Sequence, residues 1–178
     1  PQRGKRVLFG HERSSDADFH DVRRLAGLVF QDPDDQLFCP TVAEDVAFGP
    51  LNLGKSMDEA MQIVDEVLDQ LQLARYKDRV THKLSGGEKR LVTLATVLAM
   101  KPRVLLLDEP SNALDENAKA RLVEILNVLP QSMLFVSHDA HFRRKVCTRV
   151  VALQDGVMQA PAAPRCKHAV APGSLAAV

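Results

Sequence analysis

Three short apolar runs separated by helical patterns constrain the fold of this chain more than any other feature. The runs cover residues 27–30, 104–107 and 133–136. Runs this short and this apolar are typical of strands in a parallel sheet covered on both faces. Because parallel neighbours need crossover connections, strands that alternate with helices predict an α/β domain with right-handed crossovers. We therefore expect fully buried strands of one parallel sheet, and further short strands at 7–9 and 149–153.

Apolar side chains recur at helical spacing between the runs. Residues 57–73 carry Met61, Val64 and Val67 on one stripe. Similar stripes predict helices over 88–100 and 116–128, and residues 41–48 are also predicted to be helical. Residues 159–178 are rich in alanine and proline without periodicity, and this composition predicts a disordered tail.

Composition argues against several classes of protein. The 178 residues carry 23 basic and 23 acidic side chains, and this balance disfavours a dedicated nucleic-acid binder. No apolar run approaches the roughly 20 residues that cross a bilayer, so we expect any membrane role to depend on a partner. Cys39, Cys147 and Cys166 follow no metal-ligand spacing, and a reducing compartment fits them best.

A polar residue follows each apolar run. Gln31 follows the first, Asp108 and Glu109 the second, and Ser137 and His138 the third. In an open α/β sheet, ligands bind just beyond the carboxyl ends of the strands. We therefore expect an amide, two carboxylates and an imidazole to converge at one edge of the sheet.

The order of these residues resembles the nucleotide-binding subunits of ATP-binding cassette (ABC) transporters. Residues 84–90 (LSGGEKR) resemble the family signature, 104–110 (VLLLDEP) the Walker B strand and 111–115 (SNALD) the D-loop, with Ser111 and Ala113 in place of the more usual Thr and Gly. Gln31 lies where the Q-loop belongs, and His138 where the switch histidine belongs. The resemblance covers residues 1–158. It implies a P-loop NTPase-like parallel sheet flanked by helices, with a helical subdomain over about 41–100.

The resemblance implies ATP and Mg²⁺ as cofactors and gives these residues roles. Asp108 and Gln31 would contact Mg²⁺, a hard cation that prefers oxygen ligands. Glu109 would act as general base towards water, with His138 and Gln31 as the other catalytic residues. The residues that would contact the ATP of an opposite subunit are Ser85, Gly86, Gly87 and Glu88, together with Asp115.

The signature residues can also be interpreted as the start of a helix. Ser85 and Glu88 fit an S-x-x-E capping box, which alone stabilises a helix start by about 1 kcal/mol. The amides of that helix start suit an anion. Gly86 and Gly87 lack a Cβ, so a phosphate can approach the backbone closely.

One string, residues 49–56 (GPLNLGKS), matches the phosphate-loop pattern. We reject it because the preceding stretch is predicted helical, Pro50 has no N–H, and Ser56 with Glu59 fits another capping box.

Residues 1–10 resemble the family segment that follows the Walker A helix, so we expect the N-terminal strands and phosphate loop to be absent. Such a chain would expose apolar faces, be poorly stable and bind ATP weakly.

The branch of the family is indicated by residues 29–38 (VFQDPDDQLF) and 41–50 (TVAEDVAFGP), which resemble cobalt/nickel and energy-coupling-factor importers. This favours an ATPase subunit that energises import of a transition metal ion or a vitamin. It would lie on the cytoplasmic face of the membrane and pair with a second ATPase subunit, in a homo- or heterodimer. No nucleic-acid partner is expected. A transmembrane permease would be contacted through Asp35, Gln36, Leu37 and Phe38.

Two alternatives remain open. A non-catalytic partner would use its signature to complete the ATP site of an intact subunit, although Asp108, Glu109 and His138 argue against a degenerate site. A DNA-repair or chromosome-structure ATPase shares the signature and Walker B strand, but the heptad runs of its coiled coils are missing from this sequence.

Overall fold

The computed structural model describes residues 5–159 of the chain. The chain divides into two compact units, Pro1–His138 and Asp139–Val178. The tail predicted over 159–178 lies outside the described residues, except for Gln159. Within the described part, none of the helices is both long enough and apolar enough to span a bilayer.

The first unit is built on a parallel sheet of three strands in the order β3-β4-β5. These strands are Ala26–Val29, Val104–Asp108 and Ser132–Val136, each within one residue of the predicted run at both ends. Val29 pairs with Leu107, and Leu107 with Phe135, so the carboxyl ends of the strands lie level with one another. The predicted α/β class and parallel sheet are confirmed.

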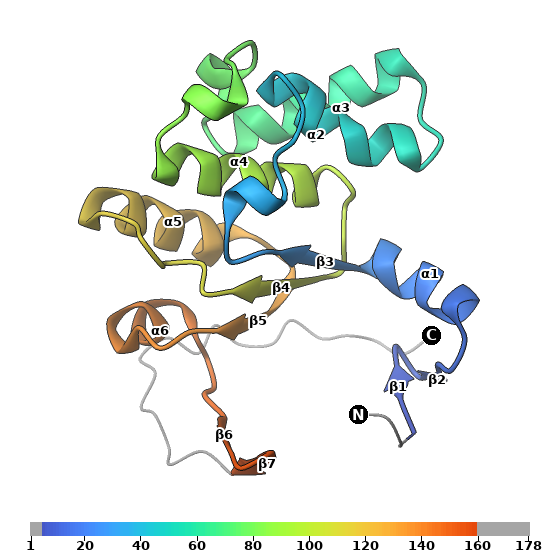
Figure 1. Cartoon of the computed structure of the whole chain (residues 1–178), viewed down its shortest axis with the longest axis vertical. Helices are drawn as coiled ribbons and strands as arrows, with labels where there is room; N and C mark the ends of the chain where they lie inside the picture. The colour runs from blue at the N-terminus through green and yellow to red at the C-terminus, as the bar shows by residue number, and fades with distance from the viewer. Residues whose placement is uncertain (1–4, 160–178) are drawn as a thin grey trace. The chain divides into compact units, whose positions relative to one another are not determined.

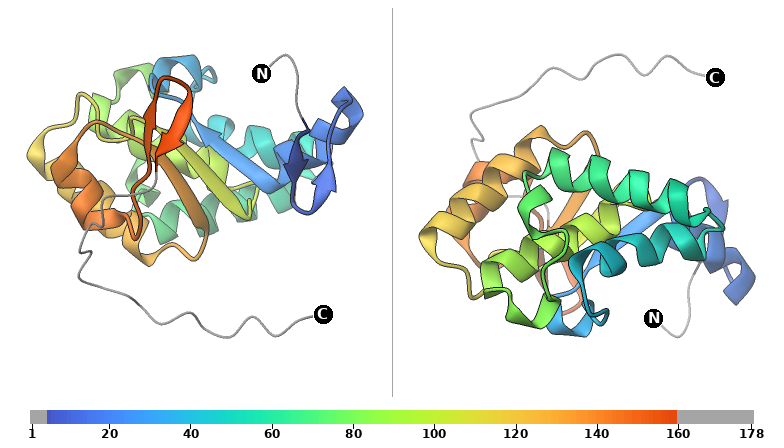
Figure 2. Two further views of the ribbon diagram at one scale, coloured as in Figure 1. Left: turned by 90° about the horizontal axis from the view of Figure 1, so that it is seen from below. Right: turned by 90° about the horizontal axis from the view of Figure 1, so that it is seen from above.

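Four helices lie on one side of this sheet (Figure 1). They are α2 (Val42–Asn52), α3 (Met57–Gln70) and α4 (Gly86–Leu98) between β3 and β4, and α5 (Glu116–Val128) between β4 and β5. Figure 2, right, shows the helices lying over the strands. Both connections step in the same direction along the sheet, and crossovers of the usual right hand then place their helices on one face.

The core lies between these helices and that face of the sheet. The helices contribute fully buried Val42, Val64 and Leu94. The sheet contributes Val29 and Leu105 from neighbouring strands. Burying a side chain of this kind stabilises the fold by about 1.5–3 kcal/mol.

The opposite face of the sheet is exposed, and the prediction that all three runs are fully buried is wrong for that reason. Leu28 keeps 43% of its surface accessible, Leu134 62% and Val136 60%. On β3, Leu28 lies between buried Gly27 and Val29, and on β5 the exposed side chains alternate with half-buried Met133 and Phe135, as the pleat requires. One-sided coverage follows from the direction of the crossovers, which an apolar run does not reveal.

Side-chain caps set where the helices begin. Thr41, Ser56 and Ser85 each precede a helix and form a capping box with a glutamate three residues later. The helix predicted over 41–48 begins at Val42 and continues to Asn52, past Pro50, which lies in its last turn. The helix predicted over 57–73 ends at Gln70, because Gln72 adopts a left-handed conformation with φ 57°.

Shorter elements complete the first unit. β1 (Val7–Leu8) and β2 (His11–Glu12) form an antiparallel hairpin whose turn residues have positive φ, and α1 (Asp16–Leu25) leads from it into β3. The strand predicted at 7–9 is thus part of a hairpin. Single turns of 3-10 helix are η1 (Pro33–Asp35), η2 (Ala74–Tyr76) and η3 (Thr81–Lys83).

The second unit, over its described residues, holds one helix and one hairpin. Asp139 caps α6 (Ala140–Val146) by accepting from the amides of His141 and Phe142. β6 (Ala152–Gln154) and β7 (Val157–Gln159) pair across a turn at Asp155 and Gly156, whose positive φ values suit a two-residue hairpin. The strand predicted at 149–153 overlaps β6.

Candidate functional site

A cavity of about 420 Å³ opens beyond the carboxyl ends of β3 and β4. Gln31 and Asp108 both line it, as the sheet argument predicts, and Gly86 at the start of α4 lines it too. The remaining lining residues are Phe30, Asp32, Pro33, Asp35, Arg90, Asn112, Ala113 and Leu114. The cavity thus joins the loop after β3, the end of β4 and the beginning of α4.

Glu109 and His138 form a second pair next to Asp108. The carboxylate oxygen Oε1 of Glu109 lies 2.8 Å from Nδ1 of His138 and accepts from the His138 backbone N–H at 3.0 Å. Glu109 donates its own N–H to the carbonyl of Val136 at 2.8 Å. Its φ of 41° is unusual for a residue with a side chain, and such strain is often stored at functional sites. The His138 imidazole and backbone N–H thus hold the Glu109 carboxylate in a fixed position.

The capping box predicted at the signature is confirmed. Ser85 N–H donates to Glu88 Oε2 at 2.7 Å, and Glu88 N–H donates to Ser85 Oγ at 3.3 Å. These hydrogen bonds, above all the one from the Ser85 backbone, lower the pKa of Glu88 below its ordinary value, with Tyr76 and Arg79 contributing less. The Glu88 carboxylate is therefore engaged within the chain.

The two signature glycines differ in their surroundings. A Cβ on Gly87 would lie 2.9 Å from the Cβ of Ala118, so α4 approaches α5 closely at this point. A Cβ on Gly86 would meet nothing within 4 Å. Packing within the chain thus accounts for Gly87, whereas Gly86 presents bare backbone to the cavity.

The D-loop runs from the cavity to α5. Asp115 caps this helix, and its Oδ1 accepts from the Ala118 N–H at 2.8 Å. Ala113 has a φ of 56°, a left-handed conformation that favours glycine. Of the predicted site residues, Gln31, Asp108 and Gly86 line the cavity. The others do not: Ser85, Gly87, Glu88, Glu109, Asp115 and His138.

Arg90 is a cavity residue to which the sequence analysis gave no role of its own. Its side chain lies in α4, is almost fully buried, and donates to the backbone carbonyls of Phe30, at 2.5 Å, and of Gln31. Burial lowers its pKa below the ordinary value, while the nearby carboxylates of Asp32 and Asp108 oppose that shift. A sequence pattern gives no signal for this contact, since its partners lie about sixty residues away.

The loop predicted to contact a permease is only partly exposed. Gln36 turns inward: it accepts from the Phe30 N–H and donates to Thr96 Oγ1 at 3.1 Å. Leu37 is buried. Asp35 is exposed, and so is Phe38, which packs edge-on against Phe48 with the ring centroids 4.7 Å apart. The contact prediction is therefore corrected for Gln36 and Leu37, whose side chains serve the chain itself.

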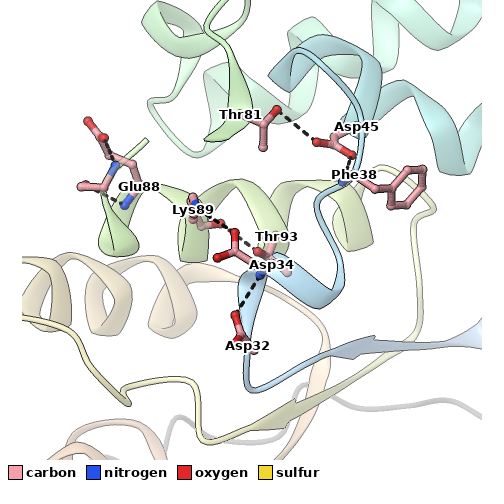
Figure 3. A network of polar contacts seen from close by, with 9 residues as sticks. Asp32, Asp34, Phe38, Asp45, Thr81, Glu88, Lys89 and Thr93 are labelled. Atoms are coloured by element: carbon pink, nitrogen blue, oxygen red, sulfur yellow. Dashed lines mark hydrogen bonds and ion pairs between the residues drawn. The ribbon is translucent and has the colours of Figure 1, made fainter. Parts of the chain in front are cut away.

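The buried carboxylate of Asp45 holds the backbone of this loop through hydrogen bonds. Asp45 Oδ1 accepts from the amides of Phe38 and Cys39, at 3.1 and 3.0 Å, and Oδ2 accepts from Thr81 Oγ1 (Figure 3). Burial, with Asp45 close by, raises the pKa of the Cys39 thiol to about 11. Neither Cys39 nor Cys147 forms a disulfide within residues 5–159, and Cys166 lies outside the described residues.

The rejected phosphate-loop string lies at the end of a helix. Residues 49–52 are the last turn of α2, and Lys55 pairs with Glu59 at 2.9 Å on the next helix. Ser56 caps α3 by accepting from the Glu59 N–H. The string continues a helix where a phosphate loop would follow a strand, so its rejection is supported.

The cavity offers oxygen ligands of the kind that Mg²⁺ prefers. Asp108 contributes a carboxylate and Gln31 an amide oxygen. Among residues 5–159 no cluster of three His, Cys, Asp or Glu side chains is arranged to hold a metal ion alone. Such a pair suits Mg²⁺, which usually keeps several waters and binds through one or two carboxylates plus substrate phosphates.

Comparisons with known proteins identify relatives of this chain. The ABC transporter family model matches residues 1–112. An ABC transporter ATP-binding protein from Brucella suis biovar 1 is 51% identical over 156 residues, which cover 88% of this chain and 65% of that protein. The energy-coupling factor transporter ATP-binding protein EcfA from Methanothermobacter thermautotrophicus is 43% identical, over 80% of this chain and 47% of EcfA. The chain thus spans about half to two thirds of the length of these relatives.

Two solved structures share the fold. One is cbiO1 from Clostridium perfringens, part of the ABC transporter complex cbiONQ, with 34% identity and a TM-score of 0.73 over 79% of this chain and 58% of cbiO1. The other is the dimeric ATP-binding cassette MJ0796 in a post-hydrolysis state with ADP and Pi, with 26% identity and a TM-score of 0.76 over 90% of this chain and 74% of that one. The fold is that of the ABC ATPases, a P-loop NTPase fold. The chain therefore belongs to the family of ABC transporter ATP-binding proteins.

Proposed function

We propose that this chain acts in an ATP-hydrolysing subunit that energises import across a membrane. The cavity that joins Gln31, Asp108 and Gly86, with the Glu109–His138 pair beside it, carries the proposal. ATP hydrolysis needs a metal held near the phosphates, an oriented water and stabilisation of phosphate charge. Each of these needs has a matching group at this end of the sheet.

The roles follow from the chemistry of each side chain. Asp108 and Gln31 would hold Mg²⁺, which would neutralise charge on the phosphates of ATP. Glu109 would accept the proton of the attacking water, since it is the carboxylate next to the metal ligand. His138 already holds Glu109 through Nδ1 and would orient it.

The start of α4 would serve the ATP of a second subunit. Gly86 offers bare backbone at a helix N-terminus, which suits a phosphate, and Ser85, Gly87, Glu88 and Asp115 would support it as caps and packing residues. The dimeric state of MJ0796 supports this arrangement by analogy.

The cargo that we propose is a transition metal ion, cobalt or nickel, or a vitamin. The likenesses to EcfA and to cbiO1 support this branch, as does the sequence of residues 29–50. A transmembrane permease would bind at Asp35 and the exposed pair Phe38 and Phe48, on the cytoplasmic face of the membrane.

ATP hydrolysis by Glu109→Gln tests the proposal. We expect kcat to fall by about 10²- to 10⁴-fold with little change in the KM for ATP, because the amide keeps the shape but not the basicity. Glu116→Gln is the matched control, since Glu116 lies in the first turn of α5 and pairs with Lys119, away from the His138 that holds Glu109. Equal rates for the two variants would refute the assignment of Glu109.

A second candidate is a non-catalytic partner that completes the site of an intact ABC subunit. One observation in its favour is that no described neighbour within 4 Å requires a glycine at position 86. Another is that the string 49–56, which matches the phosphate-loop pattern, begins in the last turn of helix α2. Mixing this chain with an intact subunit separates the candidates. Under the partner hypothesis Gly86→Val abolishes ATPase activity of the mixture, whereas Glu109→Gln leaves it unchanged.

A further inference from the structure

Three side chains attach the loop after β3 to helix α4. Lys89 Nζ lies 2.6 Å from Asp34 Oδ1, a contact visible in Figure 3. Gln36 reaches from the loop to Thr96 of the helix. Arg90 reaches from the helix to the loop. The loop that carries Gln31 is therefore attached to the helix that begins at Gly86.

Arg90 differs from the other two because its hydrogen bonds go only to the backbone of this loop. Nη1 and Nη2 donate to the carbonyls of Phe30 and Gln31, and Nε has no partner within residues 5–159. Two neighbouring carbonyls match the fixed fork of a guanidinium, which a lysine ammonium does not reproduce. Arg90 thus fixes the backbone position of Gln31 itself.

The surroundings of Arg90 argue against a purely structural role. Burying an ionised side chain against neutral carbonyls is costly, and a well-packed apolar residue often stabilises such a position more. The charges that favour the buried cation are those of Asp32 and Asp108, both of which line the cavity. Arg90 therefore contacts the backbone of Gln31 and lines the same cavity as Asp108.

We propose that Arg90 is a positioning residue that holds Gln31 in place relative to Asp108. Arg90 lies one helical turn after Gly86, and all four residues line the cavity. The same side chain therefore also ties the position of Gln31 to the start of α4. This inference rests on the proposed function, because it concerns the Mg²⁺ and water that Gln31 and Asp108 would share.

Hydrogen exchange on the full chain tests the contact without nucleotide. The amides of residues 35–37 donate to carbonyls of Asp32 and Pro33 and report on the order of the loop. We expect Arg90→Met to raise their exchange rates by about tenfold while those of α4 stay unchanged, and Arg90→Lys to have a smaller effect. Arg121→Met is the matched control, since Arg121 also donates to two successive carbonyls, of Leu71 and Gln72, but does not line the cavity.

Steady-state ATP hydrolysis separates positioning from folding. We expect Arg90→Met to lower kcat by about 10- to 100-fold with the KM for ATP within about twofold, and Arg90→Lys to recover part of the loss. Arg121→Met should match the wild type. Unchanged exchange at residues 35–37, or a kcat equal to that of Arg121→Met, would overturn the proposal. A wild-type chain without ATPase activity would count against the proposed function alone, and the exchange rates would then decide on Arg90.

Discussion

At the scale of single residues, the D-loop holds an alanine in a conformation that favours glycine. Ala113 has a φ of 56° and lines the cavity beside Leu114. A left-handed conformation costs an L-residue about 1–2 kcal/mol. The sequence departs from the usual glycine of the family at this point, and the backbone keeps the conformation that glycine would allow.

Ala113→Gly should therefore stabilise the chain. The relief of backbone strain outweighs the extra flexibility of glycine in the unfolded chain, and we expect a gain of about 0.5–1 kcal/mol in the free energy of unfolding. Urea denaturation measures it. Ala120→Gly, at an exposed position within α5, is the control and should destabilise, because its backbone is helical.

Gly86 and Gly87 lead to opposite predictions. Gly87→Ala should destabilise by about 1 kcal/mol, since the clash with Ala118 exceeds the gain in helix propensity. Gly86→Ala should keep or raise stability, because its Cβ meets open space. Thermal unfolding measures both changes. A double-mutant cycle with Ala118→Gly should show that the cost of Gly87→Ala disappears, and a cost that persists would exclude packing as its cause.

At the scale of elements, the start of α4 is stabilised by a carboxylate whose contribution depends on pH. The backbone N–H of Ser85 and further hydrogen bonds lower the pKa of Glu88. A lowered pKa in the folded state means that the contribution to stability is complete above the ordinary pKa of a glutamate, about 4.3. It is lost as the pH falls through the folded value, where the carboxylate takes up a proton.

Glu88→Gln should accordingly have a pH-dependent effect. At pH 7 the wild type should be more stable by about 0.5–1 kcal/mol, and the difference should shrink as the pH falls below about 4. Chemical denaturation of both proteins between pH 3 and pH 7 measures it. A constant difference over this range would mean that the charge of Glu88 does not contribute.

The elements also show how far the sequence predicts the structure. Local patterns served well: the strands lie within a residue of the apolar runs, and the predicted capping boxes at Ser56 and Ser85 are present. Two features depend on distant parts of the chain and were not predicted. One is the contact between Arg90 and the loop after β3, since a charged residue on a helix gives no sign of burial. The other is the inward orientation of Gln36, within a loop read as a partner contact.

At the scale of the whole molecule, we expect the exposed face of the β3-β4-β5 sheet to promote self-association. Leu134 and Val136 lie more than half exposed on β5, and Leu28, 43% exposed, lies on β3 with Leu106 of β4 between it and Leu134. Adjacent apolar side chains of this size on one face favour association. The face belongs to the same strands that carry the candidate site at their ends, so a change there needs to preserve strand geometry.

Replacing Leu134 and Val136 together by threonine should lower self-association with little loss of stability. Threonine has the β-branched shape that strands favour, and the replaced groups are already largely in water. Light scattering against concentration measures the association, and urea denaturation the stability. Leu105→Thr is the control: this buried side chain faces the helices, and its loss should cost about 2–4 kcal/mol. A comparable loss for the double variant would mean that the face is covered in solution.

The common direction of the two crossovers limits how this molecule can be redesigned. An insertion in either connection of the β3-β4-β5 sheet adds material to the side that already carries α2 to α5. A right-handed crossover places its helix on the exposed face only if it connects strands in the opposite direction along the sheet, from the β5 side towards the β3 side. An engineer who wishes to shield Leu28 and Leu134 should therefore reverse the winding, because longer helices of the present kind cannot reach them.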